Sequence, residues 1–203
     1  MASGYDGLVS YHVNRRFSRP IARALSHTAV TPNQISLLSL AVAGAAFAMF
    51  ASGQPVAGGL LAQAGSIIDG VDGDLARLTG KASPFGAFLD AVIDRYADGL
   101  VMLGLTMWTA TLYDGVLVWV IGFAALVGTF TVTYTRARID ESRRTMFDQG
   151  LASLASRDVR LFLVMLGSIA GLGLVTLLTI AVLTNAVVLV RLASARSALA
   201  ESG

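Results

Sequence analysis

Four aspartates inside apolar stretches constrain this fold more than any other feature of the sequence. Asp69 and Asp72 stand three residues apart, and Asp90 and Asp94 stand four apart. On a helix, these spacings place each pair on one face. The connector LTGKASP between the pairs contains the turn residues glycine and proline, so two antiparallel helices can turn their acidic faces toward each other. Carboxylates that converge in a low-dielectric interior repel one another, and a hard divalent cation bound through oxygen would relieve that repulsion.

Small and cationic residues accompany these acids. Gly73, Ala76 and Gly86 leave room for a ligand against the helix backbone, while Arg77 and Lys81 could neutralise phosphate at the mouth of the site. Together with Mg²⁺ or Mn²⁺, they predict a pyrophosphate-sized ligand. The alternative is that the aspartates are helix caps or solvent-facing charges at a membrane boundary. Four carboxylates in register favour a functional site, since intramembrane acids are costly.

The composition is that of an integral membrane protein. Hydrophobic residues make up 55% of the 203 residues and charged residues 14%, and the mean hydropathy is +0.68. No cysteine is present, which excludes disulfides and thiolate metal sites. We expect residues 1–203 to form a single domain whose surroundings are membrane lipids, with no nucleic-acid partner.

The apolar runs predict an all-α integral membrane fold of six transmembrane helices, preceded by an N-terminal amphipathic juxtamembrane helix at residues 5–27. Thr31 suits an N-cap, and Pro32 suits the first position of the first span. Read as one helix, residues 161–190 would extend about 45 Å, beyond a hydrocarbon core of about 30 Å, so we expect a hairpin near Gly171. Within the core, 34–192, the expected spans are 34–51, 55–77, 86–112, 115–136, 159–171 and 174–192.

Lysines and arginines are distributed asymmetrically around these spans. All 15 fall in the N-terminal segment, the second-to-third connection, the fourth-to-fifth connection and the tail, or at their flanks. The turns at 52–55, 113–115 and 171–173 contain none. By the positive-inside rule, both termini and the acidic site face the cytoplasm, which predicts residence in the cell (inner) membrane.

The acidic stretch also carries a family resemblance. The string Asp69-x2-Asp72-Gly73-x2-Ala76-Arg77-x8-Gly86-x3-Asp90-x3-Asp94 resembles the signature of the CDP-alcohol phosphotransferase family, with no position departing from it. The resemblance implies transfer of a phosphoryl-linked alcohol from a CDP-alcohol to the hydroxyl of a polar alcohol acceptor, with release of CMP. It implies that Asp69, Asp72 and Asp90 bind metal, with two ions of Mg²⁺ or Mn²⁺. Asp94 would complete this metal site and act as general base on the acceptor hydroxyl.

The same resemblance implies a nucleotide pocket. The residues that would shape it are Gly73, Ala76, Arg77 and Gly86, with Thr31, Pro32 and Asn33 near the cytosine. The N-terminal pattern is most similar to the di-myo-inositol phosphate phosphate synthase branch, which favours CDP-inositol and inositol phosphate as substrates. Domains of that branch often follow a cytidylyltransferase, and residues 1–203 contain no such domain. A phospholipid synthase that uses CDP-diacylglycerol, with phosphatidylinositol phosphate or phosphatidylglycerol phosphate as product, is the alternative.

Several assignments stay open. Arginines of the polar connection at 136–160 could bind an anionic acceptor or only extend to lipid headgroups; with Lys81, the candidates are Arg136, Arg138, Arg157 and Arg160. We expect Asp74 to point away from the Asp69–Asp72 face and to face solvent at a helix end, and we expect Asp98 to form buried hydrogen bonds. Small residues in spans three to five suggest a homodimer. A transporter with an intramembrane carboxylate relay and a non-catalytic scaffold are the competing classes, and clustering of the acids near one surface disfavours the transporter.

Overall fold

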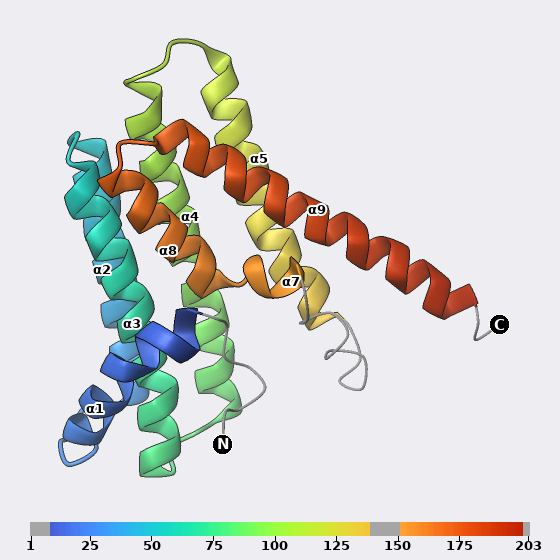
Figure 1. The fold of residues 1–203 in the computed structure, drawn as a ribbon. Coiled ribbons are helices and arrows are strands. Elements are labelled where there is room, and N and C mark those ends of the chain that lie inside the picture. The colour runs from blue at the N-terminus through green and yellow to red at the C-terminus, as the bar shows by residue number, and fades with distance from the viewer. Residues whose placement is uncertain (1–8, 139–150, 201–203) are drawn as a thin grey trace.

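The computed structural model describes residues 9–138 and 151–200, and every regular element among them is a helix (Figure 1). This confirms the all-α prediction for the described residues. The elements are a short π-helix, η1 (Ser10–Asn14), and the helices α1 (Arg15–Leu25), α2 (Pro32–Ala51), α3 (Pro55–Thr79), α4 (Pro84–Ala110), α5 (Val116–Ala137), α7 (Leu151–Leu154), α8 (Arg157–Ile169) and α9 (Gly173–Ala200).

Local sequence explains where the helices around the acids begin and end. Thr31 caps α2: its hydroxyl accepts a hydrogen bond from the Gln34 amide, while the Gln34 side chain accepts from the Thr31 amide. Pro32 follows at the first helical position, as predicted. The Ser83 hydroxyl caps α4 by accepting a hydrogen bond from the Gly86 amide. Gly80 follows the last residue of α3, and its φ of +66° is a left-handed conformation that glycine adopts without strain.

The last apolar stretch is broken into two helices, which confirms the predicted hairpin. α8 ends at Ile169 and α9 begins at Gly173. Between them, Gly171 has a φ of +70°, which allows the chain to reverse direction. With α8 only 13 residues long, or about 20 Å, this hairpin has one short arm and one long arm.

The helices pack around one main apolar core. Phe50, Leu105, Trp108 and Leu177 are buried in it. α2 lies against α3 and α4, α8 lies against α3, and α5 lies against α9. The N-terminal α1 packs against α3. Figure 1 shows α1 at the end of the molecule opposite the turns that follow α2, α4 and α8.

Glycines in this core allow close contacts between helices of the same chain. A Cβ atom at Gly122 of α5 would collide with the Thr106 side chain of α4, and one at Gly128 would collide with Thr184 of α9. Gly104 of α4 lies directly against Phe50 of α2. These glycines pack against helices of the same chain, so they do not support the predicted homodimer. The homodimer stays a prediction.

Length and composition mark three of the described helices as able to cross a membrane: α2, α5 and residues 173–195 of α9. α3 and α4 are longer than α2, at 25 and 27 residues, but they carry the aspartates. Large apolar side chains on α5 point outward, with Val116 and Phe123 exposed by 75% and 67%. Helices of this length with such a surface suit contact with lipid, as expected of a membrane protein.

Candidate active site

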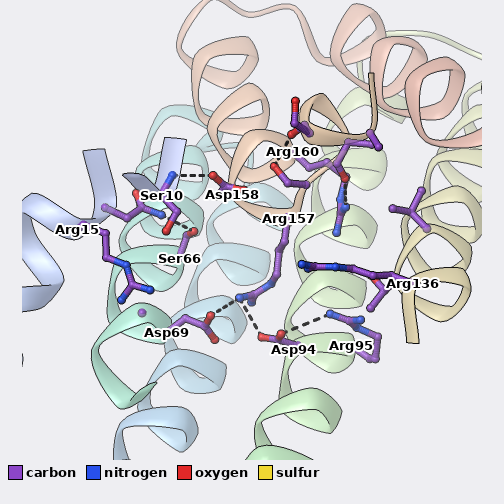
Figure 2. A pocket seen from close by; sticks show the side chains of 18 of the residues that line it. Ser10, Arg15, Ser66, Asp69, Asp94, Arg95, Arg136, Arg157, Asp158 and Arg160 are labelled. Atoms are coloured by element: carbon purple, nitrogen blue, oxygen red, sulfur yellow. Dashed lines mark hydrogen bonds and ion pairs between the residues drawn. The ribbon is translucent and has the colours of Figure 1, made fainter. Parts of the chain in front are cut away.

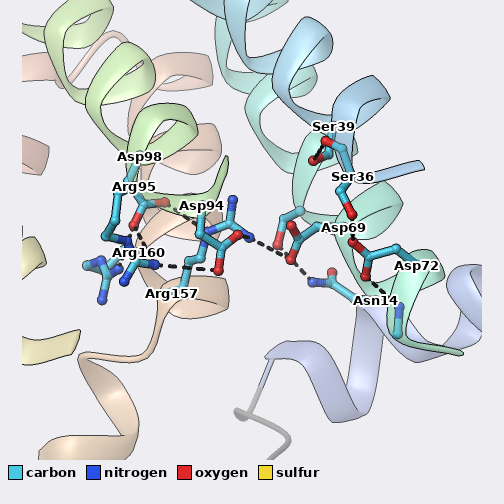
Figure 3. A network of polar contacts seen from close by, with 12 residues as sticks. Asn14, Ser36, Ser39, Asp69, Asp72, Asp94, Arg95, Asp98, Arg157 and Arg160 are labelled. Atoms are coloured by element: carbon cyan, nitrogen blue, oxygen red, sulfur yellow. Dashed lines mark hydrogen bonds and ion pairs between the residues drawn. The ribbon is translucent and has the colours of Figure 1, made fainter. Parts of the chain in front are cut away.

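The acidic faces of α3 and α4 meet. Carboxylate oxygens of Asp69, Asp72 and Asp90 all lie within 4.8 Å of one another, as the spacing of the acids predicts. Asp72 is buried and receives a hydrogen bond from the Ser36 hydroxyl of α2 (Figure 3). Three helices therefore hold the acidic cluster in place.

The donor set fits a hard cation. One buried oxygen of Asp69 and one of Asp90 have no hydrogen-bond partner among the described residues. Buried carboxylate oxygens without donors are expensive, and three carboxylates at this separation repel one another strongly. Oxygen-only ligands of this kind suit Mg²⁺ or Mn²⁺.

Asp94 lies at the side of this cluster and contacts a guanidinium. Arg157, the first residue of α8, places its Nη1 atom 2.9 Å from Asp94 Oδ1 and 2.6 Å from Asp69 Oδ2 (Figure 2). Asp94 is also 3.5 Å from Arg95. Asp94 thus lies next to Asp69 of the acidic cluster, and the two carboxylates share the Arg157 Nη1 atom.

Asp98 extends the same row of acids deeper into the molecule. It is 3% exposed, and its oxygens lie 2.8 Å from Arg157 Nε and 3.1 Å from Arg160 Nη2. Asp98 therefore forms buried hydrogen bonds, as predicted. Arg160 is 2% exposed, so the alternative in which this arginine extends to lipid headgroups is wrong. Arg157 is likewise held inside, by three carboxylates from two helices.

A cavity of about 370 Å³ opens beside Asp69 and Asp94. Its other charged lining residues are mainly cationic, and Figure 2 shows Arg136 and Arg95 on the side away from Ser10 and Ser66. The Arg157 guanidinium lines the same cavity and contacts both acids. Among the described residues, the charged side chains that line it are those of Arg15, Asp69, Asp94, Arg95, Arg136, Arg157, Asp158, Arg160 and Arg191. An anionic ligand would be attracted to such a cavity.

Asp74 is not solvent-facing, which corrects the prediction. It is 9% exposed and lies 2.7 Å from the Arg15 guanidinium and 2.8 Å from that of Arg77. The Ser18 hydroxyl donates a further hydrogen bond at 3.0 Å. Asp74 does point away from the Asp69–Asp72 face, but α1 rather than solvent covers it there.

The residues predicted for the nucleotide lie near the ends of α2, α3 and α4. The Arg77 guanidinium lies alongside Gly73, and the side-chain oxygen of Asn33 lies beside Gly86. Gly73, Ala76 and Gly86 are all partly exposed, as are Thr31, Pro32 and Asn33. The short side chains therefore leave an accessible surface beside the acidic cluster.

The predicted acceptor residues separate into two groups. Arg136, Arg157 and Arg160 line the cavity. Lys81 is exposed on the connector between α3 and α4, and Arg138 lies over the Tyr134 ring, 5.3 Å from its centroid. Neither lines the cavity, so the structure does not place Lys81 or Arg138 with the other three.

Sequence reasoning missed part of the cavity lining. Ser10, Asn14, Ser66, Asp158 and Arg191 all contribute to it. Ser66 stands one turn before Asp69 on α3, so helical spacing could have revealed it. The contributions of η1 and α9 depend on how distant helices pack, and no local pattern in the sequence indicates them.

Comparison with known proteins places the chain in a family. Residues 29–192 match the CDP-alcohol phosphatidyltransferase family model. The chain is 43% identical over 191 residues to the bifunctional IPC transferase and DIPP synthase of Rubrobacter xylanophilus, covering 94% of this chain. It spans 43% of that relative's length, which is less than half.

Solved structures agree with this assignment. Phosphatidylinositol phosphate synthase PgsA1 of Mycobacterium tuberculosis with CDP-DAG bound is 30% identical, with a TM-score of 0.71 over 87% of this chain and 92% of that one. A complex of PgsA1 with manganese and citrate is 26% identical, with a TM-score of 0.64 over 86% of this chain and 87% of that one. The chain belongs to the CDP-alcohol phosphatidyltransferase family.

Proposed function

We propose that this chain transfers a phosphoryl-linked alcohol from a CDP-alcohol to an acceptor hydroxyl and releases CMP. The observation that carries the proposal is the meeting of Asp69, Asp72 and Asp90 within 4.8 Å, at the edge of a cavity rich in arginine. Membership of an enzyme family disfavours the transporter and the scaffold.

Asp69, Asp72 and Asp90 would hold Mg²⁺ or Mn²⁺, and the manganese in the PgsA1 complex supports that choice. We propose two ions, because four carboxylates carry more charge than Arg157 and one divalent ion neutralise. When bound, the ions supply positive charge that draws electron density from the diphosphate of the donor. Asp94 would then complete the site from beside Asp69.

Asp94 is the proposed general base. It lines the cavity, and its side chain keeps 18% of its surface exposed, so an acceptor hydroxyl can reach it. The hydroxyl proton passes to the Asp94 carboxylate as the acceptor oxygen forms a bond to phosphorus. The bond from that phosphorus to the CMP oxygen breaks, and CMP leaves with the electron pair. Arg157, which contacts Asp94, fixes the orientation of the carboxylate.

The nucleotide would bind at the ends of α2, α3 and α4. Arg77, which pairs with Asp74 but keeps 61% of its side chain exposed, would contact phosphate beside Gly73. Asn33 offers a carboxamide beside Gly86 for the cytosine edge. Ala76, Thr31 and Pro32 would shape the same surface. The small side chains let the diphosphate approach the helix backbone.

Inositol-phosphate-type substrates are the proposed pair, CDP-inositol with inositol phosphate. The 43% identity to a DIPP synthase supports them. CDP-diacylglycerol as donor is the second candidate, supported by the PgsA1 structure with CDP-DAG bound. Both candidates need the same acids and differ only in what the donor carries.

Release of CMP from purified protein tests the reaction. Each donor, CDP-inositol or CDP-diacylglycerol, is combined with inositol phosphate or glycerol phosphate in detergent. We expect CMP in one combination at least, only with Mg²⁺ or Mn²⁺ present and with loss of activity on chelation. No CMP from any donor with either metal would contradict the proposal.

We also propose six membrane-spanning helices, α2, α3, α4, α5, α8 and α9, with η1 and α1 along the cytoplasmic surface. α3 and α4 extend about 37 and 40 Å, enough for a core of about 30 Å, whereas α8, at about 20 Å, is shorter than that core. Figure 1 shows the turns after α2, α4 and α8, which lack lysine and arginine, at the same end of the molecule. Both termini and the acidic site would then face the cytoplasm of an inner membrane.

The absence of cysteine makes this topology testable. Ala82→Cys lies in the connector between α3 and α4, and Asp114→Cys lies in the turn between α4 and α5. In intact cells, we expect a membrane-impermeant maleimide to label Asp114→Cys and to label Ala82→Cys only after lysis. Labelling of both before lysis, or the reverse pattern, would overturn the orientation.

A further inference from the structure

The short π-helix η1 forms one side of the cavity. Ser10 and Asn14 both line it. The Ser10 amide donates to Asp158 Oδ2 at 2.6 Å, which ties η1 to the first turn of α8. At the other end, Asn14 is buried against α3. π-Helical turns are rare and occur frequently at functional sites, and this one is fixed at both ends.

A directed chain of hydrogen bonds runs from α3 through Asn14 to the cavity. Gln63 Nε2 donates to Asn14 Oδ1 at 2.8 Å, and Asn14 Nδ2 donates to Ser66 Oγ at 3.1 Å. The exposed fractions of these residues are only 6%, 3% and 6%. Because Ser66 already accepts from Asn14, its own O–H is left to donate, and the described residues show no hydrogen bond that it donates.

The two sides of the cavity differ in charge. Figure 2 shows Ser10 and Ser66 on one side, whereas Arg95 and Arg136 lie on the other. Arg15 also lies on the side of the serines, where its guanidinium is paired with Asp74 at 2.7 Å. Guanidinium groups bind phosphate, and a neutral hydroxyl donor suits the oxygen of an alcohol. The occupant that satisfies both sides carries an anionic group at one end and hydroxyls at the other.

We propose that Asn14 and Ser66 determine acceptor specificity by reading a hydroxyl of a ring polyol phosphate. This inference rests on the proposed function. The Ser66 O–H donates to a ring hydroxyl oxygen while the arginines hold the phosphate. A cavity of 370 Å³ accommodates such a soluble acceptor. The three-carbon glycerol phosphate is held by the arginines and makes no use of Ser66.

Equilibrium binding to the full chain in detergent with Mg²⁺ tests the proposal. The probes are radiolabelled myo-inositol 1-phosphate and radiolabelled glycerol 3-phosphate. We expect Ser66→Ala to raise the Kd for inositol phosphate about tenfold, the effect of one buried hydrogen bond, and to leave the Kd for glycerol phosphate within about twofold. Ser168→Ala is the matched control, since it removes a buried serine hydroxyl that bonds only to its own helix.

A second variant reverses the hydrogen bond between residue 14 and Ser66. The Asn14→Asp carboxylate would accept from both Gln63 and Ser66, which turns the Ser66 O–H away from the ligand. We expect the same selective loss of inositol phosphate binding as in Ser66→Ala. Equal loss for both probes, or no loss for either, in a folded Ser66→Ala protein overturns the inference.

The inference and the proposed function fail separately. If CMP is released but wild-type protein binds inositol phosphate no more tightly than glycerol phosphate, only the hydroxyl-reading role is overturned. If Ser66-dependent selectivity is found but no CDP-alcohol yields CMP, the cavity reads hydroxyls as proposed and the reaction is overturned.

Discussion

Asp94→Asn is expected to lower kcat for CMP release about a thousandfold, with little change in the KM for the CDP-alcohol. Asparagine keeps the size of the side chain but cannot take the proton of the acceptor hydroxyl, and general-base catalysis contributes about 10²- to 10⁴-fold. Donor binding should persist because Asp69, Asp72 and Asp90, which meet within 4.8 Å and could hold the ions, are unchanged. Steady-state measurement of CMP, with donor and acceptor varied in turn, gives the two constants.

Asp114→Asn is the matched control, since Asp114 is an exposed aspartate in the turn between α4 and α5. Figure 1 shows that turn at the end of the molecule opposite the connector between α3 and α4. It should retain wild-type kcat. Recovery of the Asp94→Asn rate at raised Mn²⁺ would assign Asp94 to metal binding instead of proton transfer. A kcat above a tenth of the wild-type value would remove it from the role of base.

Local sequence determined most of what positions the site. Caps at Thr31 and Ser83, and the left-handed glycine that ends α3, fixed the helix ends beside the acids. Helical periodicity correctly brought Asp69, Asp72 and Asp90 together, because a short connector leaves two helices little choice but to run antiparallel. The break at Gly171 followed from helix length against membrane thickness.

What the sequence did not reveal depends on contacts between distant segments. The spacing of Asp74 correctly predicted that it points away from the Asp69–Asp72 face. The same spacing cannot show that Arg15, 59 residues earlier in the sequence, covers it. Asn14 lies in a basic amphipathic segment, where a polar residue is normally exposed. Arg157 stands in a polar connection, and nothing near it in the chain indicates that it reaches α3 and α4.

Arg157→Gln is expected to destabilise the metal-free protein by about 3 kcal/mol, which lowers its Tm by about 6–12 °C. The guanidinium contacts Asp69, Asp94 and Asp98, and removing it leaves buried carboxylates without their shared counter-charge. Thermal unfolding in detergent after chelation measures the change. Arg23→Gln, which removes an exposed arginine of α1, should leave Tm unchanged.

Arg157→Lys separates charge from geometry. The planar guanidinium of Arg157 contacts Asp98 through Nε and contacts Asp69 and Asp94 through Nη1. A lysine keeps the positive charge but has a single nitrogen, so it cannot make both sets of contacts. Its Tm should therefore fall between those of wild type and Arg157→Gln. Added Mn²⁺ should raise the Tm of Arg157→Gln more than that of wild type, because the ion then relieves repulsion that no arginine offsets. If Mn²⁺ raised all three equally, the acids that Arg157 holds would not be those that bind the ion, and the proposed site would have to lie elsewhere.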